Sequence, residues 1–196
     1  MNLERTIKNL ELRGFTVKYF ATGAEAAEYM TQEIQGCSVG IGGCQTAQQL
    51  GLYDKLSVHN TVYWHWKVPG AETLKNANAA DVYISSANAI SEDGEIINID
   101  GRGNRLAGQV FGNKRVYIVA GTNKICPDFD SALYRARNTA CVLNGKRFDN
   151  TTPCKIDDKC HDCRHPDRIC RALLVLWAPM MDMTTEIILI GEELGM

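Results

Sequence analysis

The chain has 196 residues, of which 45% are hydrophobic and 22% are charged, and its formal net charge at pH 7 is −2. This length suits one domain with a sizeable core, and the hydrophobic content excludes a mostly disordered chain. The near-neutral charge argues against a nucleic-acid binder, and no hydrophobic run reaches the ~20 residues that a membrane span needs. Because the N-terminus also lacks the hydrophobic segment of a signal peptide, we expect a soluble, cytoplasmic protein with no nucleic-acid or membrane partner.

The predicted elements of the first half alternate between helices and strands. Hydrophobic residues at helical spacing predict a helix that begins near Leu3 and ends before Gly14. Thr22 and Glu25 have the spacing of a capping box, which predicts the start of a second helix. The other elements expected are strands at 15–20, 38–41, 61–66 and 81–85, and helices at 46–52 and 71–79.

The second half adds a hairpin to this pattern. Asp93-Gly94 is typical of a tight turn between antiparallel strands. The other elements expected are strands at 95–100, 115–120, 173–177 and 186–190, and a helix at 128–139. The whole pattern predicts one α/β domain over residues 1–196, with a Rossmann-like, mostly parallel sheet flanked by helices and an antiparallel insertion.

A cluster of cysteines is the strongest chemical signal. Of eight cysteines, four fall within the polar segment 151–171, at Cys154, Cys160, Cys163 and Cys170. In a reducing cytosol they are not expected to form disulfides. Four thiolates suit a 4Fe–4S cluster or a tetrahedral zinc ion, and they exclude magnesium and calcium.

The spacing of these cysteines favours the cluster over zinc. A zinc ribbon usually has two close pairs, whereas here only Cys160 and Cys163 form one. Positive side chains that would offset the charge of four thiolates surround them, at Lys155, Lys159, Arg164, Arg168 and Arg171. Two other readings stay open: His161 or His165 as a ligand, or inert buried thiols.

A glycine-rich loop at residues 40–46 lies between a predicted strand and a predicted helix. Backbone amides at such a position can hold an anion, so Gly42 and Gly43 are candidate ligand-binding residues, and Cys44 is a candidate functional thiol. The loop is not a full dinucleotide-binding motif, since Gln45 stands where the third glycine would be. A plain tight turn is the alternative.

Polar residues also gather after the later strands, where open α/β sheets bind ligands. The candidates for ligand binding are Asn88, Arg102, Asn104, Arg105, Asn123 and Lys124. The candidates for acid, base or nucleophile are Glu92, Asp93 and Asp100. Arginines there suit a carboxylate or phosphate. The alternative is a hydrogen-bonded hairpin with solvated charges. Trp64, His65 and Trp66 are expected to pack in the core or at an edge.

Several motifs occur together: Ser85–Ile90, Glu92–Glu95, Asn98–Arg105, Gly121–Ile125, Arg135–Asn138, the four clustered cysteines and Gly191–Gly195. In this combination the chain resembles the lactate-utilisation (LUD) domain family over roughly residues 3–195, and its cysteines resemble those of a short single-domain branch. The resemblance implies a fold similar to the ribose-phosphate isomerase and CoA-transferase group, and a role in lactate oxidation alongside iron–sulfur proteins. The family's glycine loop usually carries serine where this chain has Cys44.

Three functions are consistent with these features. The first is a redox accessory that holds a metal centre, serves lactate or other hydroxy-acid oxidation, and works with redox partner proteins. The second is a transferase or isomerase that acts on an anionic small molecule, such as a phosphosugar, an acyl-CoA or a carboxylate, with a structural metal. The third is a regulatory module in which metal loss loosens the cysteine-rich segment.

Overall fold

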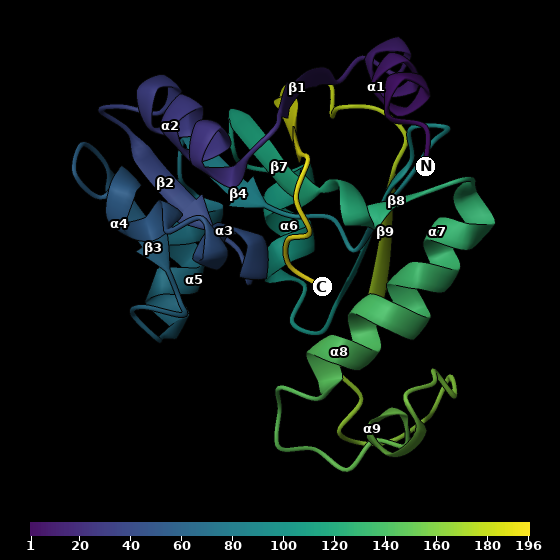
Figure 1. Cartoon of the computed structure of the whole chain (residues 1–196). Helices are drawn as coiled ribbons and strands as arrows, with labels where there is room; N and C mark the ends of the chain where they lie inside the picture. The colour runs from purple at the N-terminus through teal and green to yellow at the C-terminus, as the bar shows by residue number, and fades with distance from the viewer.

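The computed structural model describes all 196 residues, and its centre is a six-stranded sheet in which every strand pair is parallel (Figure 1). In spatial order the strands are β1 (Thr16–Phe20), β10 (Thr184–Ile190), β7 (Arg115–Gly121), β4 (Val82–Ser85), β2 (Ser38–Ile41) and β3 (Thr61–Trp64). The inner strands are buried on both faces, as the run of β-branched residues at 115–120 predicts.

Helices cover both faces of this sheet. One face packs against α2 (Gly23–Glu33), α3 (Gln45–Gln49) and α4 (Leu52–Leu56). The other faces α1 (Leu3–Leu12), α5 (Ala71–Asn78) and α6 (Asn104–Val110). The period of two along β7 divides its side chains between the two cores, since Tyr117 and Val119 join the first and Ile118 joins the second.

A second, smaller sheet lies beside the first. Its strands, in spatial order, are β8 (Ile125–Cys126), β5 (Ala89–Ser91), β6 (Ile96–Asp100) and β9 (Ala172–Leu176). β6 runs antiparallel to both β5 and β9. The antiparallel insertion predicted near Asp93 is therefore present, and the α/β fold class is confirmed.

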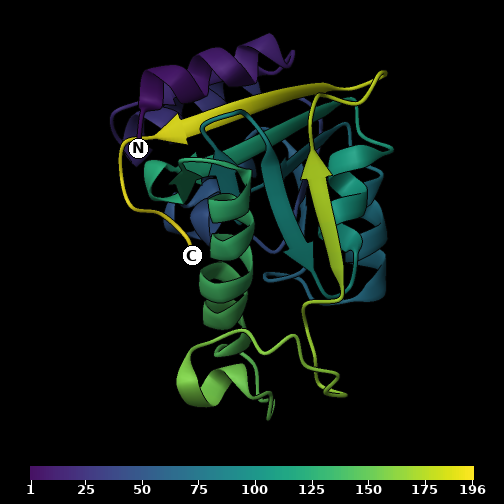
Figure 2. The ribbon, with the colours of Figure 1, turned by 90° about the vertical axis from the view of Figure 1, so that its right-hand side faces the viewer.

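A long helical segment carries the cysteine-rich region. It consists of α7 (Phe129–Arg135), a π-helical turn (Ala136–Ala140) and α8 (Cys141–Gly145), and α7 packs on the small sheet through Ala132. Figure 2 shows the segment with the short helix α9 (Cys154–Asp157) beyond the end of this rod, from where the chain returns as β9. The rod therefore holds the cysteine-rich segment at one end of the molecule.

Most predicted elements are confirmed, including the capping box formed by Thr22 and Glu25. The helix expected at 46–52 is instead two helices, because Gly51 has a φ of +63° and separates α3 from α4. The strand expected at 61–66 ends at Trp64, and α6 was not predicted. No helix of the structure is long and hydrophobic enough to span a bilayer.

Candidate functional site

A cavity of about 560 Å³ opens at the carboxyl ends of the parallel strands. Four neighbouring strands each contribute a residue shortly after they end: Cys44 after β2, Trp66 after β3, Ser86 after β4 and Lys124 after β7. Carboxyl ends of parallel strands share one edge of the sheet, so residues distant in sequence meet there.

The remaining walls make this cavity strongly positive. Six basic residues line it, against two acidic ones, Asp100 and Asp167. The basic residues are Arg102, Arg105, Lys124, Arg147, Arg168 and Arg171. We call the cavity the cationic pocket. Of these six, only Arg168 forms an ion pair within the chain, with Asp162 at 3.1 Å.

Both acidic residues of the pocket are already engaged by neighbouring groups. Asp100 accepts hydrogen bonds from the backbone N–H groups of Gly101 (2.8 Å) and Arg105 (3.0 Å). Asp167 accepts from the backbone N–H of Thr151 at 3.3 Å. Neither carboxylate forms an ion pair with a basic residue of the pocket, and the six basic residues outnumber the two acidic ones, so the pocket has an excess of positive charge that favours an anionic ligand.

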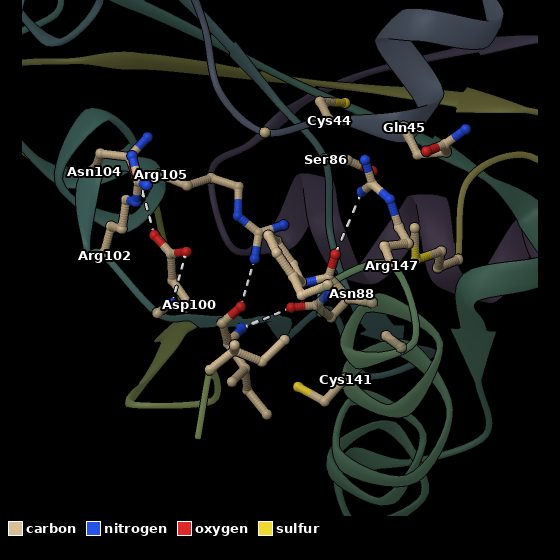
Figure 3. Close-up of a pocket in the computed structure, with 18 of the residues that line it drawn as sticks. Cys44, Gln45, Ser86, Asn88, Asp100, Arg102, Asn104, Arg105, Cys141 and Arg147 are labelled. Atoms are coloured by element: carbon tan, nitrogen blue, oxygen red, sulfur yellow. Dashed lines mark hydrogen bonds between the residues drawn. The ribbon is translucent and has the colours of Figure 1, made fainter. Parts of the chain in front are cut away.

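Two guanidinium groups reach into the pocket from opposite sides, as Figure 3 shows. Arg105 comes from α6 and donates to the carbonyl oxygen of Ile99. Arg147 follows α8 and lies over the ring of Trp66, 4.5 Å from its centroid. These contacts hold both groups in place and leave further N–H donors for a carboxylate or phosphate.

Lys124 is buried at the inner end of the pocket, with only 3% of its surface exposed. Its ammonium donates to the hydroxyl oxygens of Ser86 (2.8 Å) and Thr46 (3.3 Å). Burial, with smaller contributions from Arg135 and Arg105 and against the opposing effect of Cys44, lowers the pKa of Lys124 to about 8. A lysine in this state gives up its proton far more readily than an exposed one.

Two other reactive side chains line the same pocket. The sulfur of Cys44 accepts a hydrogen bond from the backbone N–H of Ala47 at 3.2 Å. Burial raises the pKa of the Cys44 thiol, against the opposing charge of Lys124. Burial also lowers the pKa of His65, whose Nδ1 is buried without a hydrogen-bond partner.

The clustered cysteines line a second, smaller cavity of about 20 Å³, which we call the thiol cavity. Five cysteines face it: Cys141, Cys154, Cys160, Cys163 and Cys170. Arg137 donates to the sulfur of Cys160 at 3.7 Å. As these side chains are arranged, no three His, Cys, Asp or Glu residues form a metal-binding group.

The residues of the thiol cavity nevertheless fit a metal centre by their chemistry. All eight cysteines are free, and the four predicted ligands are only partly buried. Soft sulfur donors from one segment, with arginines beside them, are the donor set of an iron–sulfur cluster or zinc. Cys141, Arg168 and Ile169 line both cavities, so the two cavities are adjacent.

Comparison with known proteins identifies the family. The sequence matches the LUD domain over residues 3–190. The chain belongs to the LUD-domain family. The fold of this LUD domain is similar to the crystal structure of a DUF162 family protein from Deinococcus radiodurans, with a TM-score of 0.57 and 12% identity over 96% of each chain. No functionally curated protein matches the sequence.

Within this LUD domain, eight of the predicted ligand-binding or catalytic residues line the cationic pocket. They are Gly43, Cys44, Asn88, Asp100, Arg102, Asn104, Arg105 and Lys124. Gly42 and Asn123 do not line the pocket. The carbonyl of Gly42 accepts from the Trp64 indole at 2.9 Å, and the side-chain oxygen of Asn123 accepts from the backbone N–H of Leu194 at 3.2 Å.

The structure does not bring Glu92 and Asp93 to the pocket. They lie at the β5–β6 turn against α1, where Glu92 accepts from the backbone N–H of Asn2 at 2.7 Å and Asp93 pairs with Arg5 at 2.6 Å. Both carboxylates therefore have a structural role, in the contact between α1 and the hairpin. The alternative reading, a hydrogen-bonded hairpin with solvated charges, describes Asp93, whereas Glu92 is buried at 6% exposure.

Several residues of the site were not among the candidates. Cys141, His65, Trp66, Ser86, Asn144 and Arg147 all line the cationic pocket. Trp64 packs in the core as expected, but Trp66 stands beyond the end of β3 and faces the pocket. A usable signal existed for Ser86, which directly follows a predicted strand. Cys141 and Arg147 come from the helical rod, whose position the sequence does not reveal.

Proposed function

We propose that this LUD domain binds a small organic anion of the hydroxy-acid class and holds a metal centre beside it, as a redox accessory of hydroxy-acid oxidation. The observation that carries this proposal is the wall shared by the cationic pocket and the thiol cavity, made of Cys141, Arg168 and Ile169. An anion in one cavity would lie next to a centre in the other.

The charge of the cationic pocket supports the anion. Arg105 and Arg147 converge there. Lys124, which also lines the pocket, is buried and has hydroxyl rather than carboxylate partners. A volume of about 560 Å³ accommodates a small metabolite. Two guanidinium groups can bind a carboxylate through paired N–H donors, which sets the orientation of the ligand as well as its affinity.

The donor set of the thiol cavity supports the metal centre. Cys154, Cys160, Cys163 and Cys170 would hold it, and Arg137 and Arg168 would offset its negative charge. A 4Fe–4S cluster there would supply one-electron transfer, whereas zinc would be structural. The cysteine-rich segment is mostly exposed, so a redox partner protein could reach it. A cytoplasmic setting would keep the eight free cysteines reduced.

Metal analysis of anaerobically prepared protein tests this function. Iron and acid-labile sulfide are expected in the wild type and in Cys37→Ser, because Cys37 lies at the start of β2, outside both cavities. Cys163→Ser is expected to lose most of the iron. Zinc in place of iron would make the centre structural, and a metal-free protein after anaerobic reconstitution would contradict the redox role.

A second candidate is an enzyme that transforms the anion itself, with a structural metal. It is favoured by the presence of two nucleophilic side chains, Cys44 and Lys124, in the same pocket. Zinc in the thiol cavity, together with turnover of a carboxylate or phosphate ester that Cys44→Ser or Lys124→Arg abolishes, would select this function over the redox accessory.

A further inference from the structure

We propose that Lys124 is a nucleophile that forms an imine with a carbonyl-bearing carboxylate, of the 2-oxo acid class, bound in the cationic pocket. This inference rests on the anion-binding function proposed above and names the ligand class more closely. Oxidation of a 2-hydroxy acid yields a 2-oxo acid, so the class of reaction that would supply this ligand is hydroxy-acid oxidation.

The position of Lys124 supports the assignment. The side chain is only 3% exposed but lines the pocket. Its amine can therefore react with a ligand bound in the pocket. A short 3₁₀ turn at Thr122–Lys124, directly after the central strand β7, holds its backbone. A buried charged side chain normally pairs with an opposite charge, but the hydrogen-bond partners of this ammonium are the hydroxyls of Ser86 and Thr46.

The surroundings of Lys124 favour the neutral amine, which is the nucleophilic form. The charged groups that face it are the Arg105 guanidinium from α6 and the Arg135 guanidinium from α7, and the titratable Cys44 thiol faces it from the start of α3. Burial, helped by the two guanidinium groups, lowers the pKa to about 8, so a useful fraction of the amine is neutral near pH 7 to 8.

The chemical step is balanced by one proton from solvent. The nitrogen lone pair of Lys124 forms a C–N bond to the carbonyl carbon, and the C=O π pair moves to oxygen. The nitrogen gives up one proton to that oxygen, which forms the carbinolamine. The hydroxyl then takes a second proton from solvent and departs as water with its bonding pair, while the nitrogen lone pair forms the C=N bond of the protonated imine. The Ser86 hydroxyl, 2.8 Å from the amine, is placed to pass the proton from nitrogen to oxygen.

The arginines set the orientation that this step needs. Arg105 and Arg147 can hold the carboxylate of the ligand, and the adjacent carbonyl carbon is then free to face Lys124. A 2-hydroxy acid has the same carboxylate but no electrophilic carbon. Both classes are therefore expected to bind, and only the 2-oxo acid is expected to react.

Reductive trapping tests this inference on the intact, metal-loaded protein. Pyruvate and cyanoborohydride at pH 8 are expected to convert Lys124 to a secondary amine, at least tenfold more extensively than the exposed Lys8 or Lys114, as read by peptide mass spectrometry. Lactate in place of pyruvate should give no adduct. Lys124→Arg keeps the charge and should lose the adduct; Lys124→Gln serves if the arginine variant does not fold.

Calorimetric titration with pyruvate separates the two proposals. Binding without an adduct on Lys124 would overturn the imine and leave the anion-binding function intact. An adduct spread evenly over exposed lysines would also overturn it. If neither pyruvate nor lactate binds to the folded protein, the proposed function and this inference fail together.

Discussion

The carboxylate of Asp100 accepts a hydrogen bond from the backbone N–H of Arg105 at 3.0 Å and one from the backbone N–H of Gly101 at 2.8 Å. Both oxygens are thus used to fix the loop between β6 and α6. This loop carries Arg102 and aims Arg105 into the cationic pocket. The geometry favours a positioning role for Asp100 rather than the acid or base role considered from the sequence.

The role of Asp100 can be tested by its removal. Asp100→Ala should lower the free energy of unfolding by about 0.5–2 kcal/mol, because it leaves N–H groups at the start of α6 without an acceptor. Asp100→Asn should retain most of the stability. Urea denaturation measures this, with the exposed Asp54→Ala as the control. Equal stability of Asp100→Ala and wild type would contradict the role.

Removal of one guanidinium should weaken anion binding. Arg105→Ala or Arg147→Ala loses charged hydrogen bonds worth about 1.5–3 kcal/mol, so lactate or pyruvate should bind roughly 10- to 100-fold less tightly. Calorimetric titration at two salt concentrations measures the affinity. Lys114→Ala, at the opposite end of β7, should bind as wild type. Unchanged affinity in both arginine variants would exclude this pocket as the anion site.

A serine variant of Cys141 can distinguish metal ligands from cysteines that only line the thiol cavity. If Cys154, Cys160, Cys163 and Cys170 hold the metal, Cys141→Ser should keep the full metal content. Each of the other four serine variants should lose it. Elemental analysis after anaerobic preparation distinguishes these cases. Metal loss in Cys141→Ser, with retention in Cys154→Ser, would move one ligand from the loop to α8.

The buried amine of Lys124 should make stability depend on pH in a defined direction. Its folded-state pKa is lowered to about 8, whereas the unfolded chain keeps 10.5. Between these values the unfolded state binds more protons, so the free energy of unfolding rises with pH. The cost of burying the charged ammonium is present in full below pH 8. Relative to Lys124→Met, the wild type should gain up to about 3 kcal/mol between pH 8 and 10.5.

Urea denaturation at pH 7, 8, 9 and 10.5 provides this comparison. Because all other titrating groups are common to both proteins, their difference isolates Lys124. The exposed Lys114→Met should follow the wild type at every pH. A difference between Lys124→Met and wild type that does not change with pH would show that the folded and unfolded states have similar pKa values at this position.

The sequence predicts the fold well where patterns are local. Hydrophobic residues that repeat every two positions identify the strands, and those that repeat every three to four positions identify most helices. The capping box at Thr22 is confirmed. The missed helix α6 contains Gly108, a residue unfavourable in helices. Packing explains why residue 108 is a glycine, because a Cβ at this position would lie 2.4 Å from the Tyr83 ring and would clash with it. That contact joins two elements distant in sequence.

The residues of the candidate site were likewise predicted where the signal is local and missed where it depends on the tertiary fold. Lys124 was predicted because it follows a strand at the edge where open α/β sheets bind ligands, and Cys44 because it lies in the glycine-rich loop between a strand and a helix. Glu92 and Asp93 also have suitable chemistry, but α1 covers their turn, and no local pattern reveals that contact. Arg147 was missed because it reaches the pocket only through the path of the helical rod.

An anion beside a cysteine-held cluster can be detected by electron paramagnetic resonance of the anaerobically reconstituted, reduced protein with and without lactate or pyruvate. We expect the signal of a reduced iron–sulfur cluster that changes shape when the anion binds. The change should be absent in Arg105→Ala. A protein without iron, or a cluster signal that a saturating anion leaves unchanged, would contradict this arrangement.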